Sequence, residues 1–146
     1  MEYLNFDIRI LSNDPYLVIA ERNQAGDAEG NLDLTIDSAE VRNALTRLEK
    51  RQTDQAWLTE FGKFLFNKLF ANQIGAHFHE AIGFSHARKD QGLRIRLRIS
   101  AKELGSIPWE LLFHPTRSFL GTDLTSPVIR WLSVDQPIHN LQTALP

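Results

Sequence analysis

The sequence contains no cysteine among its 146 residues. Disulfide bonds, thiolate metal sites and a cysteine nucleophile are therefore excluded within this chain. The opening residues, MEYLNFDIRI, carry charge from the second position and lack the apolar segment of a signal peptide, and no apolar run approaches the roughly 18 residues that a membrane span requires. We therefore expect a cytoplasmic protein that does not insert into a membrane.

Neither sign of charge is in large excess. Sixteen Lys and Arg residues stand against 18 Asp and Glu residues, a formal net charge of -2, so the chain as a whole has no electrostatic preference for nucleic acid or an anionic membrane. The glycines are scattered and form neither a GxGxxG nor a GxxxxGK[ST] loop, which leaves nucleotide hydrolysis without support. The 42% hydrophobic and 23% charged content is typical of a globular protein.

A period of two in the apolar residues predicts β-strands. Residues 4–10 (LNFDIRI) and 93–99 (LRIRLRI) alternate apolar with polar side chains, so each strand is expected to bury one face. Residues 16–20 form another apolar run after the turn formers at 12–15, and apolar residues alternate again over 32–36. We expect the three N-terminal runs to form an antiparallel meander.

Apolar residues at helical spacing predict three helices between the meander and the strand at 93–99. Asp37 or Ser38 is expected to cap the first helix, and Thr53 or Asp54 the second, because their side-chain oxygens can accept the first free amides. The third helix is expected to bury Ile74, Phe78, Ala81, Ile82 and Phe84. The predicted fold class is α+β, with an antiparallel β-sheet packed against about three α-helices in a single domain that spans residues 1–146.

Three arginines, Arg94, Arg96 and Arg98, lie on one face of the strand at 93–99, at intervals of about 6.6 Å. A row of this kind can receive an acidic partner segment or track phosphates. Alternatively, each arginine pairs with a carboxylate on a neighbouring strand or helix. The acidic overall balance favours the second interpretation.

The segment IPWELLF at residues 107–113 is the most distinctive motif. Pro108 preorganises a helical turn, since its fixed φ suits a first helical position. Trp109 is expected to be a packing anchor, with Glu110 holding an arginine or a backbone amide; an active-site acid at Glu110 is the alternative. We take Pro108, Trp109, Leu112 and Trp131 as candidate structural anchors, and Arg94, Arg96, Arg98 and Glu110 as a candidate partner surface.

The histidines do not predict a metal site. His77 and His79 are two residues apart, so on a helix their side chains point about 200° apart, and His79 and His86 share a face but lie two turns apart. His114 and His139 fall in predicted loops without a serine or acid at a catalytic spacing. We therefore predict no catalytic residue, no cofactor and no bound metal for this chain.

The arginine strand and the following segment, ELGSIPWELLFHPTRSFLGTDLTSPVIRWL, resemble the N-terminal region of bacterial CHAT-domain proteins, which are caspase-like cysteine peptidases. That region of the family reads LRLRL, then an apolar-P-W-E-L-L turn, then a loop and a strand of type PLVRYL. The resemblance covers nearly the whole chain and is most specific at residues 93–99 and 108–112. The family's catalytic histidine and cysteine belong to segments that would follow Pro146, so no catalytic position is carried over.

The resemblance implies that residues 1–146 are a non-catalytic N-terminal scaffold or regulatory module of a caspase-like peptidase. The parent protein, if longer, would be a cysteine peptidase. The expected partner is the caspase-like catalytic half, in cis or in trans, or another protein. One alternative is a stand-alone interaction adaptor in a bacterial defence or signalling system. A weaker alternative is a nucleic-acid-binding module that uses Arg94, Arg96 and Arg98.

Overall fold

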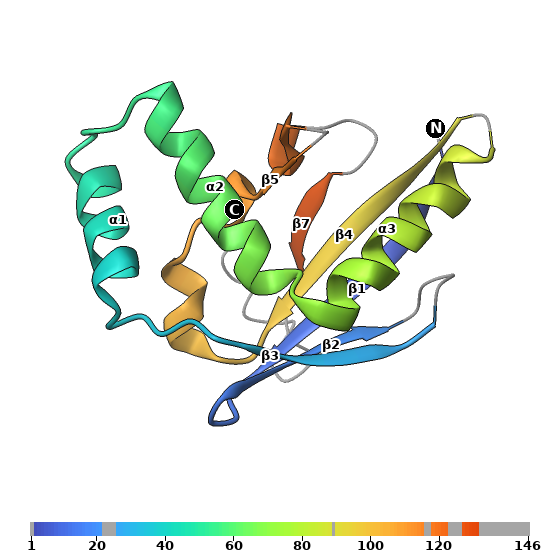
Figure 1. Ribbon diagram of the computed structural model, residues 1–146, viewed down its shortest axis with the longest axis horizontal. Helices are drawn as coiled ribbons and strands as arrows, with labels where there is room; N and C mark the ends of the chain where they lie inside the picture. Colours follow the sequence, from blue (N-terminus) through green and yellow to red (C-terminus); the bar gives the residue numbers. More distant parts are fainter. Residues whose placement is uncertain (1, 22–25, 89, 116–117, 123–126, 132–146) are drawn as a thin grey trace, which may run out of the picture.

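The fold is described from a computed structural model, over residues 2–21, 26–88, 90–115, 118–122 and 127–131. Its principal sheet has five strands in the order β3-β2-β1-β4-β7 (Figure 1). The strands are β1 (Glu2–Leu11), β2 (Tyr16–Glu21), β3 (Ala28–Leu32), β4 (Gln91–Ile99) and β7 (Val128–Trp131).

The sheet is mixed, which corrects the prediction of an antiparallel sheet. The N-terminal meander is antiparallel as expected, from β1 to β2 and from β2 to β3. However, β4 pairs in parallel with β1, and β7 pairs in parallel with β4. The chain passes through three helices between β3 and β4, and a connection of that length allows the returning strand to run parallel to β1.

The third strand lies earlier in the chain than its alternation predicts. It covers Ala28–Leu32 rather than residues 32–36. The register explains this difference, because Leu32 pairs with Tyr16, the first residue of β2, and residues after Leu32 have no β2 partner. Leu34 is nevertheless buried beyond the end of the strand.

Three helices connect the meander to β4, and the predicted α+β class with three α-helices is confirmed. Ser38 caps α1 (Ala39–Glu49), where its Oγ accepts from the Val41 amide at 3.4 Å. Asp54 caps α2 (Gln55–Leu69), where its Oδ1 accepts from the Trp57 amide at 2.8 Å. The third helix, α3 (Asn72–His86), follows after two residues, Phe70 and Ala71. No helix in the described ranges is both long and apolar enough to cross a bilayer.

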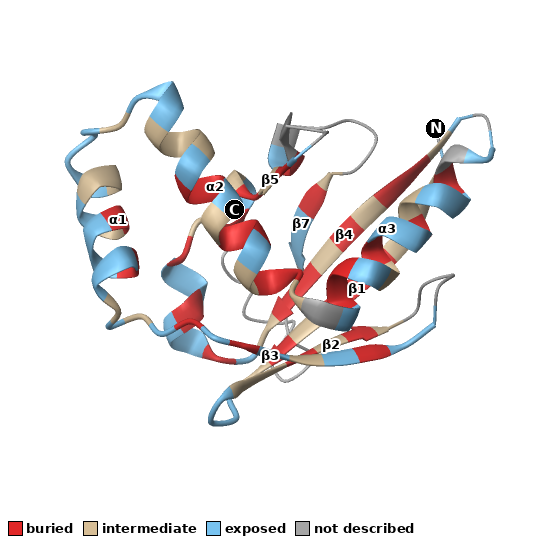
Figure 2. Ribbon diagram, viewed as in Figure 1, coloured by how far each residue is buried: buried red, intermediate tan, exposed pale blue. Residues whose placement is uncertain are grey.

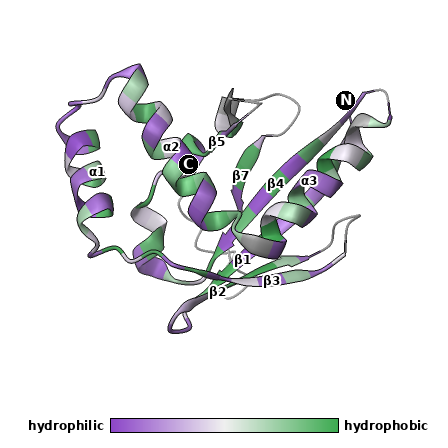
Figure 3. Ribbon diagram, in the orientation of Figure 1, coloured by the Kyte–Doolittle hydropathy of each residue, from purple (hydrophilic) through white to green (hydrophobic). Residues whose placement is uncertain are grey.

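One part of the core lies between α3 and the apolar face of the sheet (Figure 2), and another lies between α2 and residues 104–113. Phe78 of α3 is fully buried, and its ring meets that of Phe6 edge-on at 5.4 Å. Along β1 and β4 apolar and hydrophilic residues alternate, as Figure 3 shows for β4, so only one face joins the core. Phe84, predicted on the apolar side of α3, is 47% exposed. It lies six residues beyond Phe78, about 120° away around the helix, and so outside the side of α3 that packs on the sheet.

A segment without long elements leads from β4 to β7 along α2. It contains the 3-10 helices η1 (Lys102–Ser106), η2 (Trp109–Leu111) and η3 (Leu120–Thr122), and the short strands β5 (Phe113–His114) and β6 (Ser118–Phe119). Gly62 of α2 allows the close approach of this segment, because a Cβ at Gly62 would collide with the carbonyl oxygen of Leu111 and with Cβ of Phe113.

Candidate functional site

The three predicted arginines lie on the sheet face opposite to the core. The parallel register pairs Asn5 with Arg94, Asp7 with Arg96 and Arg9 with Arg98. The apolar residues between them, such as Phe6 and Ile95, are the ones that α3 covers. We call the polar rows of β1 and β4 the arginine face, defined by Tyr3, Asn5, Asp7, Arg9, Arg94, Arg96 and Arg98.

Arg96 makes the strongest ion pair of this face. Its Nε and Nη2 donate to the two carboxylate oxygens of Asp7 at 2.6 and 2.7 Å. Asp7 is 1% exposed, whereas the Arg96 side chain is 21% exposed. The hydrogen bonds to Asp7 raise the pKa of Arg96 above its usual value, although burial acts in the opposite direction. For Arg96, pairing with the neighbouring strand is therefore the correct interpretation.

Arg94 and Arg9 have neutral or longer contacts than Arg96. Arg94 donates from Nε to the amide oxygen of Asn5 at 3.0 Å, and its guanidinium carbon lies 5.8 Å from the centre of the Tyr3 ring. Arg9 lies 3.7 Å from the carboxylate of Glu21, a residue of β2 on the same face. Arg98 is 9% exposed. Glu29 of β3, which pairs with Ile19, lies on this face as well. In β1 to β4 this face thus carries four arginines and three carboxylates, a small local excess of positive charge on a chain of net charge -2.

Apolar side chains border the arginines. Ile129 of β7 pairs with Arg96, which places it on the arginine face, and it is 40% exposed. On the other side, Leu17 and Ile19 of β2 lie on the same face, half-buried. Parallel strands rarely leave one face in water. A face that combines parallel strands, positive charge and half-buried apolar residues is suited to contact with another polypeptide.

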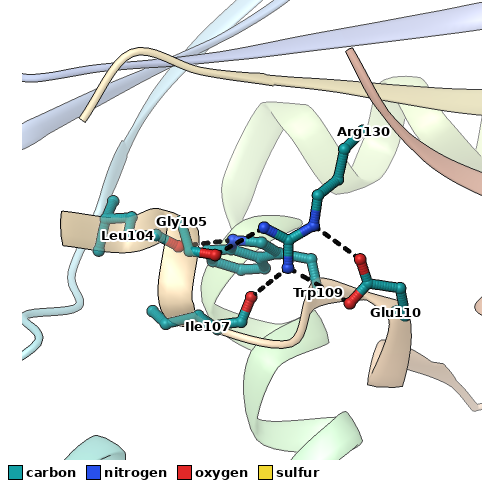
Figure 4. A network of polar contacts seen from close by, with 6 residues as sticks. All are labelled: Leu104, Gly105, Ile107, Trp109, Glu110 and Arg130. Atoms are coloured by element: carbon teal, nitrogen blue, oxygen red, sulfur yellow. Dashed lines mark hydrogen bonds and ion pairs between the residues drawn. The ribbon is translucent and has the colours of Figure 1, made fainter. Parts of the chain in front are cut away.

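Glu110 does not belong to the arginine face, which corrects the predicted partner surface. Arg130 of β7, aligned with Leu97, projects towards the opposite side of the sheet and binds Glu110 there (Figure 4). Its Nε donates to Glu110 Oε1 at 2.6 Å, and its Nη1 and Nη2 donate to the carbonyl oxygens of Gly105 and Ile107, both at 2.6 Å.

Arg130 holds the segment that contains η1 and η2, residues 102–111, against β7; we call it the 3-10 segment. Partial burial alone would raise the pKa of the Glu110 carboxyl, but the hydrogen bonds from Arg130, a backbone hydrogen bond and the charge of Arg130 together lower it below its usual value. Glu110 is thus held ionised as a structural partner of Arg130 rather than poised as an acid. Arg130 was missed in the sequence because a single arginine in an apolar strand has no recognisable spacing.

The predicted anchors lie in or beside this segment. Trp109 and Leu112 are fully buried, and the Trp109 indole donates from Nε1 to the Leu104 carbonyl oxygen at 3.1 Å. Pro108 is half-buried. Trp131 ends β7, and its side chain lies outside what the structure describes.

Among the described residues, no three His, Asp or Glu side chains gather into a metal-binding cluster. Comparisons with family models, with curated proteins and with solved structures found no match. The resemblance to CHAT-domain proteins therefore stays a prediction.

Proposed function

We propose that this chain is a non-catalytic, cytoplasmic scaffold or regulatory module that docks a protein partner on its arginine face. The observation that supports the proposal is the composition of that face, where arginines outnumber carboxylates on parallel strands and apolar side chains lie at the margins. A complementary partner segment carries carboxylates flanked by apolar residues. The CHAT resemblance suggests that the partner is a caspase-like catalytic half. The chain has no cysteine, so a thiolate would have to come from that half.

The test uses this chain and a separately expressed histidine- and cysteine-containing half encoded downstream or alongside. We expect the chain to bind that half and to change its thermal stability or its rate of peptide cleavage. If neither quantity changes when the chain is added, the scaffold proposal is wrong.

Two variants locate the binding surface. Arg94→Glu reverses a charge whose contacts, with Asn5 and the Tyr3 ring, are neutral. We expect this change to weaken binding by about tenfold or more, because it removes electrostatic complementarity. Ile129→Thr removes part of an exposed apolar contact but keeps the β-branch. The matched control is Arg42→Glu, a reversal at an exposed position of α1. Equal loss in Arg94→Glu and Arg42→Glu would contradict docking on the arginine face.

The alternative of a stand-alone adaptor uses the same face with a different partner. It is distinguished by the gene, because a reading frame that continues past Pro146 into a histidine- and cysteine-containing segment favours the peptidase module, and a stop codon favours the adaptor.

Nucleic acid is the weakest candidate partner, since Asp7, Glu21 and Ile129 interrupt what would have to be a phosphate-binding surface. If nucleic acid were bound through these arginines, the affinity would fall steeply as salt is added.

A further inference from the structure

Two histidines that are distant in sequence meet on the helix side of the sheet. His79 lies on α3 and His114 lies in β5, and their Nε2 atoms are 3.3 Å apart. Because this pair lies on a different side of the sheet from the arginine face, nothing inferred from it rests on the proposed docking function. The sequence could not predict this pair, because spacing along the chain relates only histidines of the same helix.

The hydrogen bond of His79 determines its tautomer. Its Nδ1 lies 2.9 Å from the carbonyl oxygen of Gly75, one turn earlier on α3. A carbonyl oxygen can only accept, so Nδ1 carries the proton, and in the neutral ring Nε2 presents a lone pair towards His114. An imidazole that donates its other N–H to a backbone carbonyl is the usual arrangement of a metal-bound histidine.

The geometry of the two rings fits a shared metal ion. A tetrahedral zinc ion at about 2.05 Å from each nitrogen would separate the two nitrogens by about 3.3–3.4 Å. With each ring centre about 1.15 Å behind its nitrogen, the ring centres would be about 5.2 Å apart. The observed separations are 3.3 Å between the nitrogens and 5.3 Å between the ring centres. A long N–H hydrogen bond between the two rings would give the same nitrogen separation, so only the presence of a bound ion distinguishes the two cases.

The surroundings hold the pair in place and leave one side open. His114 is 4% exposed, and its ring packs edge-on against Phe66 and Phe78, with ring centres 5.1 and 5.9 Å away. The residue His79 is exposed, so an ion can enter from its side. Both histidines are thus oriented by packing or hydrogen bonding before any ion binds, which reduces the ordering cost of binding.

We propose that His79 and His114 form a two-imidazole site for Zn²⁺, with water or another molecule's ligand completing the coordination. Imidazole nitrogen is a favoured ligand of zinc. A bound ion joins α3 to β5 and so stabilises the segment that carries Trp109. Only two of these ligands come from the described residues, so a chelator removes the ion readily.

The test is a titration of the whole chain, without a polyhistidine tag, with Co²⁺ as the spectroscopic probe and Zn²⁺ as competitor. We expect a saturable visible absorption band at one Co²⁺ per chain, displaced by Zn²⁺, and a Zn²⁺-dependent rise in melting temperature. His79→Ala and His114→Gln should each lose both signals. The control, His77→Ala, changes a histidine of the same helix whose Nδ1 contacts Gly26 instead, and should keep both.

A protein that shows no saturable Co²⁺ band and no Zn²⁺-dependent stabilisation would overturn the proposal and leave a simple hydrogen bond between the rings. Equal signals from the parent and His79→Ala would overturn it too. Because His79 is exposed, its replacement is not expected to unfold the chain, and far-ultraviolet circular dichroism checks this. If His114→Gln fails to fold, the His79→Ala and His77→Ala comparison still decides the outcome.

Discussion

The ion pair between Asp7 and Arg96 should contribute much more to stability than the neighbouring pair between Arg9 and Glu21. Both pairs join adjacent strands on the arginine face. The first is bidentate, at 2.6 and 2.7 Å, with Asp7 1% exposed. The second is a single contact at 3.7 Å between side chains that are 34% and 22% exposed. The two pairs therefore form a matched comparison within one sheet.

The magnitudes follow from burial. Removing one partner of a buried ion pair costs about 3–5 kcal/mol, because the other charge is left without compensation. Arg96 keeps about a fifth of its side chain in water, so Asp7→Ala should cost about 3 kcal/mol, near the lower limit. Arg96→Ala leaves the carboxylate of Asp7 in the interior and should cost about 3–5 kcal/mol.

The assay is a double-mutant cycle for each pair, with the free energy of unfolding measured in urea. For Asp7 and Arg96 we expect a coupling energy of about 1.5–3 kcal/mol, the range of hydrogen bonds to charged groups. For Arg9 and Glu21 we expect less than about 1 kcal/mol, as for partly exposed pairs. Equal coupling energies in the two cycles would refute the reasoning from burial and geometry.

Further predictions concern the 3-10 segment, the helices and the pH dependence. Trp109→Ala should lower the free energy of unfolding by about 3–5 kcal/mol, since a fully buried side chain is lost; a variant that melts like the parent would show the anchor assignment to be wrong. Gly62→Ala should lower the free energy of unfolding by about 1–3 kcal/mol through overpacking. Gly83→Ala is the matched control, because its Cβ meets nothing within 4 Å. It should raise the free energy of unfolding by about 0.5–1 kcal/mol in the same urea assay. The hydrogen bond that Tyr16 donates to Glu103, with a smaller effect of burial, raises the pKa of Tyr16 to about 12. The contribution of this hydrogen bond to stability should therefore be fully present below about pH 10 and decline as the pH rises towards 12. The difference in free energy of unfolding between the parent and Tyr16→Phe should shrink over that pH range. A constant difference would argue against the hydrogen bond.

Local sequence was enough to predict the strands β1, β2 and β4, the three helices and, to within one residue, the caps at Ser38 and Asp54. These features depend on residues two to four positions apart, so their signals are contained in short windows. The end of β3 could not be read in this way, because it depends on where β2 begins. The exposure of Phe84 was not predicted either. Near the end of a helix, only the residues before it indicate which side of the helix is apolar.

The contacts that give this protein its candidate sites were decided by the tertiary structure. Asp7 and Arg96 are 89 positions apart, and they meet only because β4 runs parallel to β1 in one particular register. His79 and His114, and Arg130 and Glu110, also lie far apart in the sequence, 35 and 20 positions, and are likewise brought together only by the packing of separate elements. Alternation along a strand determines which side chains share a face, but the direction and register of the neighbouring strand determine which of them touch.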